Sequence, residues 1–554
     1  MGKIFDKICT RDNFDNAIKR LKQNKGSKTP GTDGKNIEYI LNNSDITYEE
    51  IRHLLKYKYV PKTVKRTYIV QNNKRRPLGI PTIRDRVIQQ MFKQILEPIA
   101  EKKFHPNSYG FRPNRSTEQA IAHQSNLINR AKLYYCVDVD IKGFFDNINH
   151  KKLIKQVWAI GIKDKKVISI IKSMLKANIL HQDGTIEKPT KGTPQGGILS
   201  PLLANICLNE FDWWIHNQWA GKKTRTKYTH QRTKEEYLRK ASNLKEVKIV
   251  RYADDFKLMC RTMEEAKTYF SLTKIFLKDK LKLDISPEKS RVVNLRRSYS
   301  VFLGFTVRAK RKICTHTEYV ARVWICKKAK KRIHRKLKDT IKDIRNSSGK
   351  DVIKNVINYN AKVRGIQNYY CLATRCSEDL SHIGLHLNRM KYNIWGRADN
   401  YKDIRYKRFY KGFNSKTWSI GGITLFNIQN IRFKKPKMKR KSEKLTKIKT
   451  LENNSEYLYN RLRYSDNPEW DKIRAIIYHE RKGKCEITNE FMKHNEFDVH
   501  HIIPREFGGD DIKDNLIIIK SEIHKELHRK KPNDYVHKYK KFDKYRKILL
   551  ELIK

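Results

Sequence analysis

The sequence is poor in acidic residues and lacks any long apolar run. Asp and Glu number 58 among 554 residues, against 121 Lys and Arg. No apolar stretch approaches the ~18 residues that suggest a membrane span, and the first segment, MGKIFDKICTRDNF, is charged throughout, unlike a signal peptide. These absences predict an intracellular, soluble protein with no membrane partner, in a bacterial cytoplasm or in an organelle matrix or stroma.

Paired cysteines are also absent. The nine cysteines include no Cys-x-x-Cys pair, so they are expected to be reduced and mostly buried thiols. This pattern argues against a zinc site made of four cysteines.

The excess of cations gives a formal net charge of +63. A chain with this charge would repel itself unless a polyanion neutralised it, which favours nucleic acid as the partner. A basic surface that associates with anionic membranes is the plainer alternative. Hydrophobic residues make up 38% of the chain, enough for folded cores, and the length suggests three or four domains of ~150 residues each.

Two acidic segments stand out in this basic chain. Residues 249–260, IVRYADDFKLMC, place Asp254 and Asp255 between two short apolar runs, which predicts a hairpin with both carboxylates at its tip. Adjacent carboxylates are tolerated either in solvent or around a divalent cation. Residues 134–141, YYCVDVDI, predict a strand with one aliphatic face, with Asp138 and Asp140 on the other face.

The segment DIKGFFD, which begins at Asp140, is followed about a hundred residues later by YADD. Together they resemble motifs A and C of the reverse transcriptases that group II introns encode. The resemblance implies that Asp140, Asp254 and Asp255 hold two Mg²⁺ ions for nucleotidyl transfer. Asp138 is not a ligand in the family pattern. The implied fold is α+β and multidomain, with the fingers and palm of a right-hand polymerase.

Four other residues are implied to contact the incoming nucleotide (dNTP). Residues 66–71 and 76–80 predict a β-hairpin, which resembles the fingers hairpin. The resemblance makes Arg76 the first candidate for the triphosphate ligand, with Lys74 or Arg84 next. Phe145 would be the steric gate beside the ribose, whereas Phe144 fits a core position. PQGGILSPLLAN resembles motif B and implies that Gln195 contacts the nucleotide or template. PEKS resembles motif D, with Lys289 as general acid for the departing pyrophosphate.

A loop rich in aromatic residues and arginine, SYGFRPNRST, lies between the predicted hairpin and Asp140 and also resembles the family. Two interpretations of Tyr109, Phe111, Arg112 and Arg115 stay open, namely packing within the loop and contact with RNA or template.

The resemblance divides the chain into four parts. Residues 1–308 would be fingers and palm, 309–410 the helical thumb or maturase (X) domain, 411–465 a basic DNA-binding region and linker, and 466–554 an endonuclease. The segment 431–450 carries ten cations and one acid, so it can neutralise several phosphates; a nuclear-localisation signal is the weaker alternative.

The last part contains FDVHHIIP, a glycine pair, NLIII and a His-x-x-x-His pattern. Together they resemble the ββα-metal fold of HNH nucleases. The resemblance implies a divalent metal, taken as Mg²⁺, on His500, His524 and His528, with His501 as the base and Asn515 fixing its geometry. Relatives often carry cysteine pairs for structural zinc, but only Cys485 stands in this region, which argues against such zinc.

As a whole, the sequence resembles a multifunctional group II intron-encoded protein. The expected activities are RNA-directed DNA polymerisation, assistance to intron splicing, and nicking of target DNA whose new end primes cDNA synthesis. The expected partners are intron RNA, target double-stranded DNA and dNTPs. The alternatives are a maturase that only binds RNA for splicing, and a reverse transcriptase outside introns, of the retron or defence kind.

Overall fold

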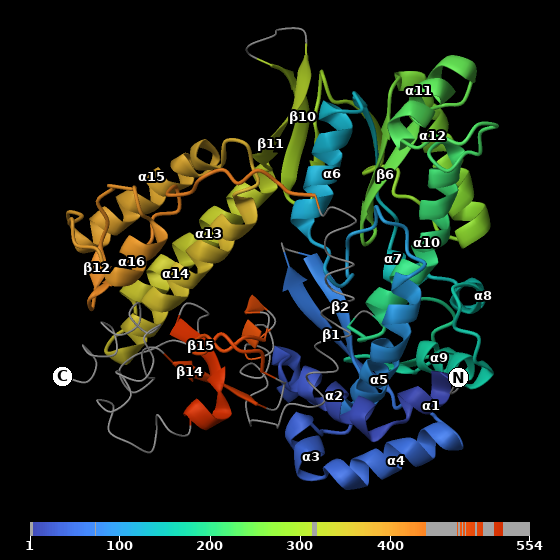
Figure 1. The fold of residues 1–554 in the computed structure, drawn as a ribbon, viewed down its shortest axis with the longest axis horizontal. Helices are drawn as coiled ribbons and strands as arrows, with labels where there is room; N and C mark the ends of the chain where they lie inside the picture. The colour runs from blue at the N-terminus through green and yellow to red at the C-terminus, as the bar shows by residue number, and fades with distance from the viewer. Residues whose placement is uncertain are drawn as a thin grey trace. The chain divides into compact units, whose positions relative to one another are not determined.

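The structure is a computed structural model, and it divides the chain into two compact units, Met1–Met438 and Lys439–Lys554 (Figure 1). In the larger unit it describes residues 4–71, 74–194, 196–312 and 318–438. In the smaller unit it describes residues 474, 477, 478, 480, 481, 483–492, 496–501 and 515–524. The four-part division of the sequence stays a prediction.

The chain begins with helices that pack around one long helix, α5. The first elements are α1 (Ile4–Ile8), α2 (Arg11–Lys22), the 3₁₀ turn η1 (Lys25–Lys28), α3 (Ile37–Asn42), α4 (Ser44–Lys56) and α5 (Ile83–Glu101). The hydroxyl of Thr82 caps α5 by accepting a hydrogen bond from the backbone amide of Asp85.

The predicted hairpin before α5 is present and belongs to a four-stranded sheet, which we call the outer sheet. Its strands are β1 (Val64–Gln71), β2 (Lys74–Ile80), β4 (Ile179–Leu180) and β5 (Ile186–Glu187), in the order β2-β1-β4-β5. The strands β1 and β2 run antiparallel until Gln71 faces Lys74. They are therefore longer than the sequence predicted, and residues 72 and 73 between them lie outside the described residues.

A second four-stranded sheet, the central sheet, carries the acidic segments. Its strands are β3 (Tyr135–Val139), β6 (Val247–Tyr252), β7 (Asp255–Cys260) and β8 (Arg291–Asn294), in the order β6-β7-β3-β8. All three pairings are antiparallel. Val137, Val139 and Ile141 lie in one hydrophobic core, and Cys136 lies in another on the opposite face. Both faces of this sheet are therefore covered.

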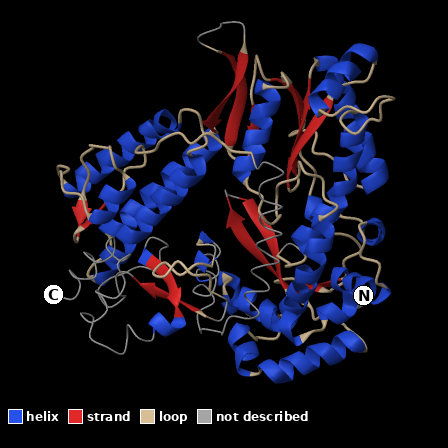
Figure 2. Ribbon diagram, in the orientation of Figure 1, coloured by secondary structure: helices blue, strands red, loops and turns tan. Residues whose placement is uncertain are grey.

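The helices α6 (Thr117–Asn129), α10 (Ser200–Gln218) and α12 (Met263–Phe276) pack against strands of the central sheet (Figure 2). The same part of the chain also forms α7 (Phe144–Asn147), α8 (His150–Ala159), α9 (Lys165–Leu175), α11 (Gln231–Ala241) and the π-helical turn η2 (Leu277–Leu281). The helices α10 and α12 contribute Phe211 and Ala266 to the first core, and α6 contributes Ile121 to the second. Thr262 and Glu265 form a capping box that fixes the start of α12.

The sequence predicted a helical domain over 309–410. The region after the central sheet contains strands as well as helices. A three-stranded sheet, β9 (Ser300–Phe302), β10 (Phe305–Arg311) and β11 (Tyr319–Ile325), comes first. It is followed by α13 (Lys327–Arg345), α14 (Lys350–Tyr370), α15 (Cys376–Trp395), α16 (Ile404–Phe409), β12 (Ser419–Ile420) and β13 (Ile423–Thr424). In α13, Ile333, Leu337 and Ile341 recur every four residues and are buried on one face of the helix. These elements share the second core with α6.

The described part of the smaller unit centres on a hairpin of β14 (Phe497–His501) and β15 (Leu516–Lys520). Its own small core includes Ile477, Met492 and Ile518. In neither unit does the described chain contain a helix that is long and apolar enough to cross a membrane. The described cysteines are free thiols, and six of the eight are buried.

Candidate active site

Strand pairing in the central sheet brings the three aspartates to one end. Val139, the last residue of β3, pairs with Phe256 of β7, so Asp140 leaves β3 beside the start of β7. Tyr252 pairs with Asp255, which puts Ala253 and Asp254 in the turn between β6 and β7. The sequence placed both carboxylates at the tip, whereas Asp255 already belongs to β7.

The pKa values of Asp254 and Asp255 are both raised. Burial raises the pKa of Asp254, and the nearby Asp140 carboxylate raises it further, while Arg251 and Arg76 lower it. The pKa of Asp255 is also raised by burial, with Lys257 opposing the shift. Close like charges are unfavourable without a cation, so this end of the sheet suits a divalent ion.

Two of the three carboxylates contact a lysine. Nζ of Lys289 lies 2.9 Å from Oδ2 of Asp140, and Nζ of Lys257 lies 3.1 Å from Oδ1 of Asp255. Within the described ranges, no three His, Cys, Asp or Glu side chains stand close enough to hold an ion as they are arranged. The donor chemistry fits Mg²⁺, which prefers carboxylate oxygens, but binding by all three aspartates requires these lysine contacts to change.

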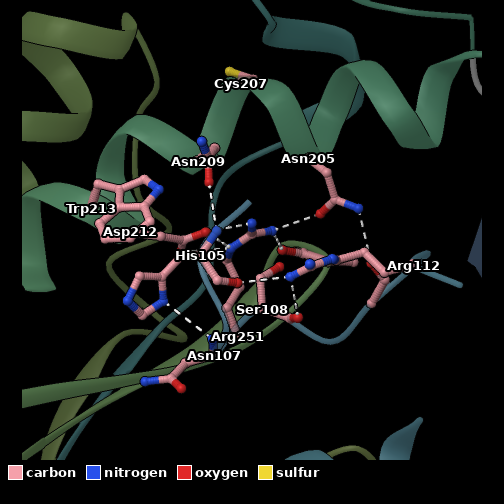
Figure 3. Close-up of polar contacts among 12 residues, drawn as sticks. His105, Asn107, Ser108, Arg112, Asn205, Cys207, Asn209, Asp212, Trp213 and Arg251 are labelled. Atoms are coloured by element: carbon pink, nitrogen blue, oxygen red, sulfur yellow. Dashed lines mark hydrogen bonds and ion pairs between the residues drawn. The ribbon is translucent and has the colours of Figure 1, made fainter. Parts of the chain in front are cut away.

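A buried arginine anchors the hairpin that carries Asp254 (Figure 3). Arg251 is fully buried and forms a double hydrogen bond with Asp212 of α10, at 2.8 Å from Nε and 2.6 Å from Nη2. Its Nη1 donates to Asn205 and to the carbonyl of Ala253, at 2.9 and 2.8 Å. Ala253 has a φ of 58°, a left-handed conformation that is rare outside glycine. The arginine therefore holds the tip in this turn.

The loop SYGFRPNRST packs against the same hairpin. The amide of Tyr109 donates to the carbonyl of Arg251 at 2.8 Å, and the amide of Arg251 donates to Asn107 at 3.0 Å. A Cβ on Gly110 would lie 2.2 Å from the backbone nitrogen of Ala253. Arg112 is buried against Glu101 at 2.8 Å. Tyr109 and Arg112 thus follow the packing interpretation; Phe111 is exposed.

The residues predicted to contact the nucleotide lie on segments that meet near the aspartates. Arg76 is on β2, and its charge lowers the pKa of Asp254. Gly196 approaches β2 so closely that a Cβ there would lie 2.5 Å from the carbonyl oxygen of Gly79. The amide of Thr193 donates to the carbonyl of Phe145 at 2.7 Å.

The structure describes three of the four residues predicted to contact the nucleotide. Phe145 is partly buried, while its neighbour Phe144 is buried and packs against it with ring centroids 5.4 Å apart. Lys289 lies beside Asp140. Gln195 lies outside the described residues.

The predicted histidine site is only partly described. His500 and His501 end β14, opposite Ile517 and Leu516 of β15, and Asn515 directly precedes β15. The ring centroids of His500 and His524 are 5.3 Å apart. His528 lies outside the described residues.

Sequence reasoning missed one acidic residue of the histidine site. Asp498 lies 3.6 Å from Nδ1 of His524 and 3.6 Å from the guanidinium of Arg474. Its position two residues before His500 on the same strand puts both side chains on one face, and that period was the available signal.

Part of the chain matches a known protein family. Residues 60–307 match the family model described as "Reverse transcriptase (RNA-dependent DNA polymerase)", a segment that includes all three aspartates. The chain is 34% identical over 300 residues to Protein YkfC of Escherichia coli (strain K12), covering 52% of this chain and 78% of that protein.

Two further relatives carry intron-related names. The chain is 33% identical over 354 residues to the Group II intron-encoded protein LtrA of Lactococcus lactis subsp. cremoris, covering 56% of this chain and 57% of LtrA. It is 29% identical over 175 residues to Nuclear intron maturase 2, mitochondrial, of Arabidopsis thaliana, covering 24% of this chain and 23% of that protein. The chain thus spans less than two thirds of either of these two relatives.

Proposed function

Because this chain belongs to the group II intron-encoded reverse transcriptases, we propose that it polymerises DNA on an RNA template and assists the splicing of its intron RNA. One observation supports the polymerase activity most strongly. Asp140, at the end of β3, lies beside the β6–β7 turn that holds Asp254. The raised pKa of Asp254, to which the nearby Asp140 carboxylate contributes, supports a shared cation.

In this proposal Asp140, Asp254 and Asp255 hold two Mg²⁺ ions. When bound, Mg²⁺ supplies charge that lowers the pKa of the primer 3′-hydroxyl and neutralises the leaving pyrophosphate. Arg76 binds the triphosphate from the β1–β2 hairpin, an assignment that its electrostatic influence at Asp254 supports. Phe145 acts as a steric gate that crowds the ribose 2′ position, and Gln195 contacts the nucleotide or the template.

Lys289 acts as the general acid for pyrophosphate. Its ammonium is within 2.9 Å of Asp140 and its side chain is 60% exposed, so it stands at the site and has room to move. An ammonium can donate its proton to a departing phosphate oxygen. To do so, Lys289 exchanges its contact with Asp140 for one with the pyrophosphate.

The remaining parts of the chain bind nucleic acid in this proposal. Residues 309–410 form the thumb or maturase domain, which holds the duplex and the intron RNA. The exposed cations of α13 support this role: Lys327, Lys328, Lys331, Arg332, Arg335, Lys336, Lys338, Lys342 and Arg345. Residues 411–465 supply phosphate contacts to target DNA, with a dependence on salt that grows with each contact.

Residues 466–554 are proposed to be the HNH nuclease that nicks target DNA. His500, His524 and His528 hold the divalent metal, His501 activates water, and Asn515 orients His501. The proximity of His500 to His524, and the position of Asn515 beside the end of the hairpin, support this assignment. The new DNA end then primes cDNA synthesis, so that the intron inserts by retrohoming as a ribonucleoprotein.

The polymerase is tested by replacing Asp254 with Asn in the full chain. Primer extension on an RNA template with dNTPs and Mg²⁺ should fall by about 10³-fold or more, because the loss of a metal-holding carboxylate removes transition-state charge stabilisation. Glu264→Gln, at a carboxylate that is 82% exposed on α12, is the matched control and should extend primers like the unmodified protein. Undiminished extension by Asp254→Asn refutes the proposed site.

A further inference from the structure

Behind Asp255 the central sheet contains a buried lysine. Lys257 lies two residues along β7 and its side chain is only 6% exposed. Directly opposite in the sheet register is Asp138 of β3. The ammonium lies 3.3 Å from Asp138 and 3.1 Å from Asp255, so one buried cation is shared by two carboxylates.

The two carboxylates differ in their surroundings. Asp138 is buried and accepts a hydrogen bond of 2.6 Å from the hydroxyl of Ser300. The guanidinium of Arg291 lies 3.6 Å from its other oxygen. Asp255 is 41% exposed and lies at the end of the sheet where Asp254 and Asp140 meet. Asp138 is therefore fixed in the interior, while Asp255 is the partner that faces the site.

We propose that Lys257 is a positioning residue that restrains Asp255 and weakens its hold on a divalent cation, to a degree that Asp138 sets by sharing the ammonium. The inference rests on the proposed polymerase function and deepens it. A cation bound by Asp255 competes with the ammonium for the carboxylate and is repelled by its charge. Asp138 reduces both effects, because it draws part of the ammonium's interaction toward the interior.

Substitutions on the two sides of this lysine should act in opposite directions. Asp138→Asn leaves Lys257 to Asp255 alone, so divalent binding should weaken. Lys257→Met combined with Asp138→Asn removes the ammonium without leaving a buried carboxylate uncompensated, so binding should become tighter than in the unmodified protein. A lysine that only neutralised Asp138 would produce neither shift, and misfolding does not tighten binding.

Iron-directed cleavage measures this binding without relying on polymerisation. Fe²⁺ bound to the full chain, with ascorbate and peroxide, cuts the backbone near its site, and the cut fragments at residues near 140 and 254 are quantified against Fe²⁺ concentration. Mg²⁺ is then added as a competitor. We expect the half-saturating concentration to rise about threefold or more for Asp138→Asn, and to fall by a similar factor for the double variant.

Lys391→Met is the matched control, because Lys391 is also fully buried but lies on α15, away from the central sheet. It should leave the cleavage curve unchanged. Unchanged binding in both test variants, or shifts in the same direction, overturns the role of Lys257. If the unmodified protein is cut at neither segment, the proposed metal site itself fails, and the inference fails with it.

Discussion

The buried cationic side chains of this protein differ in whether a carboxylate lies beside them. Arg251 and Lys257 each contact a carboxylate. Lys391 instead lies 3.2 Å from the side-chain oxygen of Asn427 and 4.5 Å from the ring centroid of Trp418. Both of these partners are neutral, and burial lowers the pKa of Lys391 to about 7. The charged form of this lysine is therefore costly to the folded state.

This cost leads to a pH prediction. The pKa of an unfolded lysine is about 10.4, so between pH 7 and 10 the unfolded chain binds more protons than the folded chain. The contribution of Lys391 to the free energy of unfolding of the unmodified protein therefore rises as the pH increases from 7 towards 10. Lys391→Met should be more stable at pH 7, by roughly 1–4 kcal/mol after the loss of the contact with Trp418.

The measurement is the melting temperature of both proteins from pH 7 to pH 9 at constant salt. The gap between the variant and the unmodified protein should narrow as the pH rises. A gap that widens, or a less stable variant at pH 7, contradicts the assignment of a costly buried charge.

At the scale of elements, the β6–β7 hairpin depends on a loop that is distant in sequence. The loop around Gly110 and the tip at Ala253 come so close that no side chain fits between them. Asn205 of α10 donates to the carbonyl of Gly110 at 2.9 Å and accepts from Arg251. Loop, helix and hairpin are therefore one unit, and the position of Asp254 depends on all three.

Replacing Gly110 with Ala tests this coupling. The added methyl group meets backbone atoms, which cannot move aside as a flexible side chain can, so the tip must shift. We expect a loss of about 1–3 kcal/mol in the free energy of unfolding and a fall of at least about tenfold in the rate of primer extension.

Gly26→Ala is the control, since nothing lies within 4 Å of a Cβ at that position. It should change neither quantity appreciably. Urea unfolding gives the first quantity, and single-turnover extension gives the second. Normal extension by Gly110→Ala would show that the tip tolerates displacement.

At the scale of the whole molecule, the two proposed active sites lie in different compact units, Met1–Met438 and Lys439–Lys554. Separate cores stabilise them, with Phe256 in one and Ile518 in another. Damage to one set of catalytic side chains should therefore leave the other activity intact.

His501→Ala tests this separation in the full chain bound to intron RNA. Nicking of DNA that joins the two exon sequences should fall by about 10²–10⁴-fold, because the base that activates water is lost. Primer extension and RNA affinity should not change. Asp254→Asn should instead lose primer extension and keep its nicking activity. Undiminished nicking by His501→Ala removes the nuclease assignment.

Local sequence determined much of this protein. The alternation around Val137 and Asp138 predicted a strand, and the apolar runs around Asp254 predicted a hairpin; both are observed. Ile333, Leu337 and Ile341 recur every four residues, a spacing that places them on one helix face, and that face of α13 is buried. These features follow from periods of two or 3.6 residues, which a short segment carries by itself.

Only the tertiary structure decided which residues meet across long separations. Arg112 could have faced RNA, and it is buried against Glu101; Lys257 resembled one more residue of a strand, and it joins Asp138 to Asp255. A buried charge needs a partner, but its local pattern does not say which strand or helix supplies one. For Lys257, strand register supplies Asp138 as the partner, and register forms only when the sheet is assembled.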